Sequence, residues 1–190
     1  MKLLLIRHGQ SEANINRLVT GNDDTPLTAS GIAQAEQLRD SIQNLISQFD
    51  DSIAFYASPA NRALETSRLA GVPSERLKID HRLKETDAGA VKTMSLDKFN
   101  RLYPEFFGNF KITSKYPEGE SHVEMIQRSI AFLSDIIHTN YAYQVVFAHN
   151  GSINSILHKC DNVAFEKFPH FKVGHCQIIS RDVQPNIFDR

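Results

Sequence analysis

One stretch near the start of the chain, Leu3-Leu4-Leu5-Ile6-Arg7-His8-Gly9-Gln10-Ser11, decides the fold. Its four consecutive apolar residues predict a short strand that is buried on both faces, as in a parallel sheet. A cation, an imidazole and Gly9 follow at once, and glycine permits a tight turn and the close approach of a ligand. Because open α/β sheets bind ligands just past the carboxyl ends of their strands, we expect Arg7 and His8 to contact a ligand.

The composition is that of one globular domain spanning residues 1–190. The chain is 41% hydrophobic and 23% charged, and its length suits a single core. A net charge of −1 gives no general attraction to nucleic acid or to an anionic membrane, so neither is an expected partner. The two cysteines, Cys160 and Cys176, argue against a disulfide framework and favour a reducing compartment. The first apolar run is too short for a signal peptide and no run approaches the roughly 18 residues that span a bilayer, so we expect a cytoplasmic protein.

Short apolar runs alternate with amphipathic stretches along the chain. The predicted strands are residues 3–6, 53–57, 77–79, 144–148 and 177–179. Helices are predicted from the N-cap Thr28 to residue 49, from the N-cap Ser58 to residue 71, over 96–102, from the capping box at Ser121 to residue 137, and after residue 151. This alternation predicts a three-layer α/β/α sandwich around a mainly parallel central sheet.

Two of the predicted strands end in the same way. Each runs into a histidine that precedes a glycine, His8 in the first strand and His149 in the fourth. The second strand ends at Ser58, and Arg62 lies in the first turn of the helix that follows. Because parallel strands share one carboxyl edge, these histidines, Arg7 and Arg62 are expected to converge. Two guanidinium groups and two imidazoles at one point favour a dianion such as phosphate, and the helices that start at Ser58 and Asn150 would add backbone N–H donors.

An imidazole in such a cluster can act as a nucleophile. Neighbouring arginines disfavour the imidazolium form and keep the attacking nitrogen of His8 free near neutral pH. A leaving alkoxide needs a proton, and Glu85, in the turn after the third strand, is the best placed carboxyl group. The alternative is that Glu85 is a loop carboxylate paired with Arg82 or Lys84.

Several short motifs stand in an order that is typical of a known family. Arg7 to Asn14 resembles its opening signature, in which the histidine becomes phosphorylated, and Thr20-Gly21, Asp24 and 26–28 continue it. Segments 58–62, 83–85 and 149–151 resemble those that carry the second phosphate-binding arginine, the acid and the second histidine. The chain thus resembles the histidine phosphatase, or phosphoglycerate mutase-like, superfamily. The resemblance implies that fold, with catalytic His8, Glu85 and His149, and with phosphate or substrate contacts from Arg7, Asn14, Thr20, Gly21, Arg62 and Asn150.

Within that superfamily the chain most resembles the fructose-2,6-bisphosphatase branch. The similar residues are Glu85 to Gly89, Met94, Tyr103-Pro104-Glu105 and 116–121. The anchors for a second phosphate are altered, because Leu96 and His122 stand where the branch has tyrosines and the place of its arginine falls near Phe110 or Lys111. Lys111, Lys115 and His122 are the candidate replacements, and the physiological substrate is left open.

The sequence therefore predicts a metal-independent phosphomonoesterase that needs no cofactor and hydrolyses a small phosphorylated metabolite through a phosphohistidine at His8. His8 and His149 lack a nearby third ligand, so no metal is expected. Asn14 has the alternative of only capping a turn, and His175-Cys176 with Arg181 fails the spacing of a cysteine-phosphatase loop. Two other functions stay open, namely mutase-type phosphoryl transfer and a non-catalytic module that binds a phosphorylated ligand. Protein partners and the oligomeric state are unknown.

Overall fold

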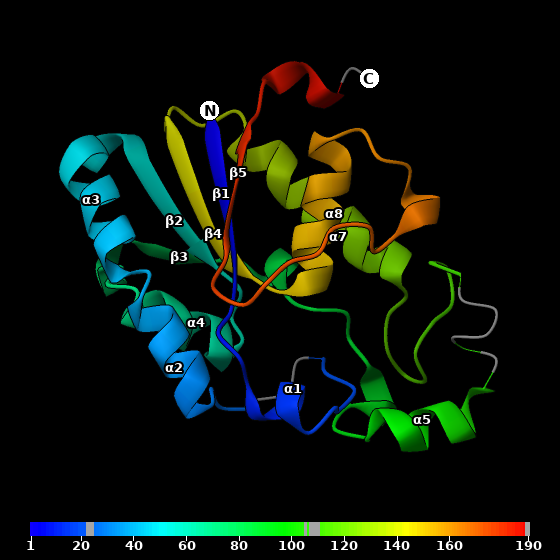
Figure 1. Cartoon of the computed structure of the whole chain (residues 1–190). Helices are drawn as coiled ribbons and strands as arrows, with labels where there is room; N and C mark the ends of the chain where they lie inside the picture. Colours follow the sequence, from blue (N-terminus) through cyan, green and yellow to red (C-terminus); the bar gives the residue numbers. More distant parts are fainter. Residues whose placement is uncertain (22–24, 105, 107–110, 189–190) are drawn as a thin grey trace.

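A five-stranded sheet forms the centre of the computed structural model, which describes residues 1–21, 25–104, 106 and 111–188. Asp24, Glu105 and Phe110, named above for their resemblance, lie outside the described residues. Helices cover both faces of the sheet (Figure 1). The strands are β1 (Lys2–Arg7), β2 (Ile53–Ala57), β3 (Leu77–Ile79), β4 (Tyr143–Ala148) and β5 (Ile178–Asp182). The helices are α1 (Glu12–Ile15), α2 (Ala29–Glu36), α3 (Arg39–Phe49), α4 (Asn61–Leu69), α5 (Leu96–Leu102), α7 (His122–Ile136) and α8 (Asn150–Cys160).

The strand order β3-β2-β4-β1-β5 confirms the predicted mainly parallel sheet. β1, β2, β3 and β4 run parallel, and β5 pairs antiparallel with β1 at one edge. β4 therefore lies between β1 and β2, although it is far from both in sequence. This order places the carboxyl ends of β1, β4 and β2 next to one another.

The two faces of the sheet bury alternate residues of the same strands, as the two-residue period of a strand requires. Leu3 and Leu5 of β1 join the core beneath α7 and α8, whereas Leu4 and Ile6 join the core beneath α3 and α4. All four are buried, with exposed fractions between 0% and 6%. The three-layer sandwich expected from the sequence is confirmed (Figure 1).

Three predictions about element boundaries are wrong, and several other predicted ends differ from the structure by one or two residues. The stretch from Thr28 to residue 49 forms two helices, because the N–H of Leu38 donates to Ala35 O over 3.2 Å in a tighter turn that separates α2 from α3. Ser58 is not an N-cap, since α4 begins at Asn61. β5 runs to Asp182, three residues beyond the predicted end, because an edge strand with a half-exposed face need not be apolar.

The carboxyl edge of the sheet is covered by α1, α5 and the long connections (Figure 1). Val19, Ala88, Val91 and Phe99 form a small separate core there. The capping box predicted at Ser121 is confirmed: the Glu124 N–H donates to Ser121 Oγ, and the Glu124 carboxylate accepts from the Ser121 N–H. These elements surround the strand ends and leave a hollow beside them.

Candidate active site

The strand register brings the two histidines together. Arg7 lies opposite Ala148 in the β1–β4 ladder, so His8 and His149 follow neighbouring strands at the same level. Their ring centroids are 5.1 Å apart, with the planes at 60°. The Ser58 N–H donates to Phe147 O over 2.9 Å, which adds the end of β2 to the same edge. The convergence follows from the strand order, because β4 pairs with both β1 and β2.

The imidazole of His8 is held in one tautomer. Its Nδ1 is 2.7 Å from Gly9 O, and since a carbonyl oxygen can only accept, Nδ1 carries the proton and Nε2 has the lone pair. The Arg62 Nε–H donates to this Nε2 over 3.3 Å. Burial lowers the pKa of His8 well below its ordinary value, and the charges of Arg62 and Arg7 lower that pKa further. His8 thus presents a neutral, unprotonated Nε2 at neutral pH.

Two buried guanidinium groups adjoin that nitrogen. Arg62 is 2% exposed and donates through Nη2 to Gly21 O over 2.9 Å. Arg7 donates through Nη1 to Val173 O over 2.9 Å, while its buried Nε–H finds no acceptor among the described residues. Burial lowers the pKa of Arg7 and the carboxylate of Glu85 opposes that shift, but a guanidinium remains charged at neutral pH. A buried positive charge with an unused donor fits an anionic ligand.

His149 lies at the N-cap of α8 and is completely buried. Its Nε2 is 2.8 Å from Ser58 Oγ, so the hydroxyl that was predicted to cap α4 contacts the second histidine instead. Burial lowers the pKa of His149 well below its ordinary value, and the charges of Arg62, His8 and Arg128 act in the same direction. The site therefore holds two neutral imidazoles between two cationic arginines.

Glu85 is held by backbone N–H groups rather than by a cation. Its Oε1 accepts from the Thr86 N–H over 3.0 Å and its Oε2 from the Gly151 N–H over 3.1 Å. The N–H of Gly151 belongs to the first turn of α8, which thus binds the carboxyl group of Glu85. The alternative pairing with Arg82 is absent from the described contacts, because Arg82 donates to Asp80 and Asp135.

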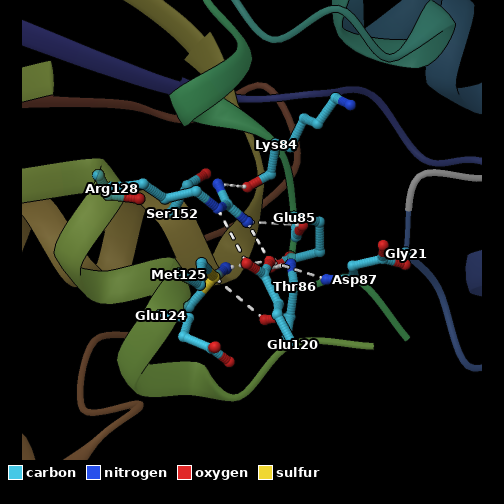
Figure 2. Close-up of polar contacts among 12 residues, drawn as sticks. Gly21, Lys84, Glu85, Thr86, Asp87, Glu120, Glu124, Met125, Arg128 and Ser152 are labelled. Atoms are coloured by element: carbon cyan, nitrogen blue, oxygen red, sulfur yellow. Dashed lines mark hydrogen bonds and ion pairs between the residues drawn. The ribbon is translucent and has the colours of Figure 1, made fainter. Parts of the chain in front are cut away.

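Arg128 on α7 fixes the backbone on either side of Glu85 (Figure 2). Its guanidinium donates to the carbonyl oxygens of Arg82, Lys84 and Glu85 over 2.8, 2.7 and 2.9 Å. It also forms an ion pair with Glu120, which in turn accepts from the N–H of Asp87 over 2.9 Å. Sequence reasoning missed Arg128, because its partners are main-chain atoms 43 to 46 residues earlier and no motif marks it.

His175 is the second functional residue that sequence reasoning missed. Its ring lies 5.6 Å from that of His8, and its Nδ1–H donates to the carbonyl of His8 over 2.9 Å. Burial and the charge of Arg7 lower its pKa. The sequence showed His175 only as part of a rejected cysteine motif. Cys176 itself is half-buried against the apolar core.

Beside Glu85 lies a hollow of about 260 Å³, which we call the leaving-group hollow. It is lined by Leu18, Val19, Thr20, Glu85, Thr86, Leu96, Tyr116, His122, Asn150, Gly151, Phe168 and Pro169. The predicted contact residues Thr20 and Asn150 are thus part of it. Lys111 and Lys115 lie elsewhere: each lines a different hollow, and Lys115 pairs with Glu124 over 2.6 Å.

The remaining predicted contacts have local roles in the structure. Asn14 Oδ1 accepts from both the N–H and the hydroxyl of Ser11 over 3.0 Å, so Asn14 does cap α1, and its amide NH₂ is the donor that it can offer to an anion. Gly21 supplies the carbonyl that fixes Arg62, and a Cβ there would lie 2.9 Å from the Ala88 N. In the part of the chain that the structure describes, no three His, Cys, Asp or Glu residues gather as metal ligands, and no helix is long and apolar enough to cross a membrane.

Comparisons with known proteins identify the family of the chain. A family model described as "Histidine phosphatase superfamily (branch 1)" matches residues 3–188. Human 6-phosphofructo-2-kinase/fructose-2,6-bisphosphatase 1 is 35% identical over 129 residues, and the match covers 66% of this chain but only 26% of the human protein. The chain therefore matches about a quarter of the length of that relative.

Two solved structures extend the comparison. Phosphoglycerate mutase from Thermus thermophilus superposes with a TM-score of 0.67 at 28% identity, over 84% of each chain. A mycobacterial glucosyl-3-phosphoglycerate phosphatase superposes with a TM-score of 0.79, over 94% of this chain and 91% of that one. Its 21% identity makes it a likeness of fold alone.

Proposed function

The chain belongs to the histidine phosphatase superfamily, branch 1, and on that basis we propose that it is a metal-independent phosphomonoesterase that works through a phosphohistidine. The observation that carries the proposal is the state of His8. Its Nδ1–H is bound to Gly9 O, its Nε2 is unprotonated, and Arg62 and Arg7 adjoin it. A buried neutral imidazole with its lone pair beside two guanidinium groups suits attack on a phosphate dianion.

In the first step, His8 Nε2 donates its lone pair to phosphorus, and the bond between phosphorus and the ester oxygen breaks. Arg7, Arg62 and His149 hold the transferring phosphoryl oxygens, whose negative charge the guanidinium groups offset. The departing oxygen takes a proton from the carboxyl group of Glu85, which lines the leaving-group hollow. The products of this step are the free alcohol, phosphohistidine and the Glu85 carboxylate.

In the second step, a water oxygen attacks phosphorus and the bond between nitrogen and phosphorus breaks. The Glu85 carboxylate takes one proton from that water, which restores the acid for the next cycle, and inorganic phosphate leaves. Asn14, Thr20, Gly21 and Asn150 complete the binding of phosphate or substrate in this proposal. The substrate is a small phosphorylated metabolite.

The test is hydrolysis of 4-nitrophenyl phosphate by the purified protein in excess EDTA. The proposal expects turnover that is insensitive to the chelator, and a loss of at least ~10³-fold in kcat for His8→Ala. The matched control is His138→Ala, which removes an exposed histidine just past the end of α7 and should keep full activity. A phosphoryl group trapped on His8 by an alkaline quench and found by mass spectrometry is also expected. Full activity of His8→Ala would refute the proposal.

The two other functions give different results in the same assays. A mutase would move phosphate between the positions of a phosphoglycerate faster than it releases inorganic phosphate. A binding module would bind a phosphate ester without turnover. The intact set of His8, Arg62, Glu85 and His149 favours hydrolysis over the binding module.

A further inference from the structure

The leaving-group hollow carries information on the substrate, provided that the proposed function holds. It adjoins the phosphate-binding groups through Glu85 and Gly151, which line it and are hydrogen-bonded to each other. If Glu85 protonates the ester oxygen, the part of the substrate beyond that oxygen lies in this space. The chemistry of its walls then selects the alcohol that the enzyme releases.

No lysine or arginine lines this hollow among the described residues. Nearby cations have other partners: Arg17 pairs with Asp97 over 3.7 Å, Lys115 pairs with Glu124, and Arg128 binds three carbonyl oxygens and Glu120. The internal residues outside the described part carry no basic side chain in the sequence, as they are Asn22, Asp23, Asp24, Glu105, Phe107, Gly108, Asn109 and Phe110. No undescribed internal residue can therefore supply a cation to this space.

The ionisable groups that do line the hollow are neutral or acidic near neutral pH. Burial lowers the pKa of His122 and raises that of Tyr116 to about 12, so both rings are uncharged. The third group is the carboxyl of Glu85. A second anionic group on the substrate would meet a carboxylate when Glu85 is ionised. It would meet no countercharge when Glu85 is protonated, and both situations are unfavourable.

The rest of the lining combines an apolar side, formed by leucine, valine and proline side chains and the ring of Phe168, with a neutral polar side. Its volume of about 260 Å³ is below the ~300–1,000 Å³ of sites for drug-sized ligands. Thr20, Thr86 and Asn150 supply the neutral polar groups. Such a space suits a small alcohol with one apolar face and few hydroxyl or amide groups.

We propose that this enzyme selects phosphate monoesters of small uncharged alcohols that carry an apolar or aromatic face, and that it discriminates against substrates with a second anionic group. Bisphosphorylated sugars and carboxylated phosphate esters are thus poor substrates. In this proposal neither lysine anchors a second phosphate: Lys115 is paired with Glu124, and Lys111 lines a neighbouring hollow that shares only Phe168 with this one.

The experiment compares kcat/KM for phenyl phosphate, 4-carbamoylphenyl phosphate and 4-carboxyphenyl phosphate. The last two have nearly the same shape and differ in one negative charge, so their ratio isolates charge from size. We expect the carboxylate ester to be about tenfold or more poorer than the carbamoyl ester. A carboxylate ester that is equal or better overturns this inference while the proposed function stands. Failure to hydrolyse any of the three in a His8-dependent way refutes the proposed function and this inference with it.

Two matched variants test the hollow itself. Leu96→Arg adds a cation to the lining, and we expect it to reduce the preference for the carbamoyl ester by about tenfold. Leu102→Arg adds the same charge at a leucine of the same helix that is 56% exposed and lines a different hollow, and it should leave the preference unchanged. An effect of Leu102→Arg as large as that of Leu96→Arg would overturn the inference. If Leu96→Arg fails to fold, the wild-type ratio alone decides.

Discussion

Substituting Gly151 by alanine would displace Glu85, the proposed acid, while leaving His8, the proposed nucleophile, in place. A Cβ built on Gly151 overlaps Oε1 of Glu85 and lies 2.8 Å from Sδ of Met125, which is fully buried and packed. The carboxyl group must therefore retreat by on the order of 1 Å, and its hydrogen bond with the Gly151 N–H is strained or lost. The atoms nearest to this Cβ belong to Glu85 and Met125, so the added methyl group contacts those side chains and not His8.

The size of the effect follows from the role of Glu85. A positioned general acid contributes ~10²–10⁴-fold to a rate, and a misplacement of ~1 Å costs about 10²-fold. We therefore expect kcat for an alkyl phosphate to fall about 10²-fold in Gly151→Ala. Overpacking costs about 1–3 kcal/mol of stability, offset by about 0.5–1 kcal/mol from alanine in a helix, so the variant should fold.

The assay varies the basicity of the leaving group. With 2,4-dinitrophenyl phosphate the leaving oxygen needs little protonation, so we expect Gly151→Ala to lose less than about fivefold in kcat. The control is Gly174→Ala, whose added methyl group meets only the flexible end of Gln177 at 3.1 Å and should leave both rates unchanged. Equal losses on the two esters would show that Glu85 is not the acid or that the methyl group disturbs the whole site.

Three further predictions concern the support of the site. Burial lowers the pKa values of His8, His122, His149 and His175 in the folded state, so the unfolded state binds protons that the folded state does not. The free energy of unfolding should therefore fall below pH 6.5, by up to ~1.4 kcal/mol per pH unit for each of the buried His8 and His149 and by less for the more exposed His122 and His175. Urea denaturation at pH 7.5 and 5.5 that shows no such fall would contradict these shifts. Ser58→Ala removes the hydroxyl next to His149 Nε2 and leaves this buried nitrogen without a partner, so stability should fall by about 1–3 kcal/mol. We expect kcat to fall about tenfold, and an unchanged kcat would show that the contact does not support the reaction. Arg128→Met should lower the free energy of unfolding by about 3 kcal/mol and should lower kcat on alkyl phosphates by ~10-fold. The control is Arg181→Met, which breaks an exposed pair with Asp161. It should change the free energy of unfolding by less than ~1 kcal/mol and leave kcat unaltered.

The bounds of an element could be predicted where its buried residues form an apolar run in the sequence. β2 has the predicted bounds because all five of its residues are buried, and an apolar run marks such a strand. β5 was misjudged because it is an edge strand whose Ser180 and Arg181 are polar. The break between α2 and α3 was missed because no proline or glycine marks it, and the apolar period continues through it. Local pattern therefore gives the existence of the elements but not every end of them.

For the site, the sequence predicted the residues that follow strands and missed those that act from a distance. His8, His149, Arg7 and Arg62 could be grouped because parallel strands share one edge. Arg128 and His175 bind the main-chain carbonyl groups of Glu85 and His8, and a carbonyl acceptor leaves no signature in a sequence. Ser58 does stand in a recognisable sequence pattern, but that pattern is typical of a helix N-cap. Only the pairing of β2 with β4 shows that its hydroxyl contacts His149 instead.

The two halves of the site rest on different kinds of structure. The groups that we propose to hold phosphate follow central strands whose register is strongly specified, because a shift of one residue would turn buried side chains such as Leu5 to the opposite face. The leaving-group hollow is formed largely by loops and short elements around Leu96, Tyr116 and Phe168, where substitution disturbs little of the central core. Under the proposed function, a change in this lining would therefore redirect the enzyme to another alcohol while the phosphoryl chemistry stays intact. The substrate preference of this chain should therefore depend on the charge and shape of that lining rather than on the residues at the strand ends.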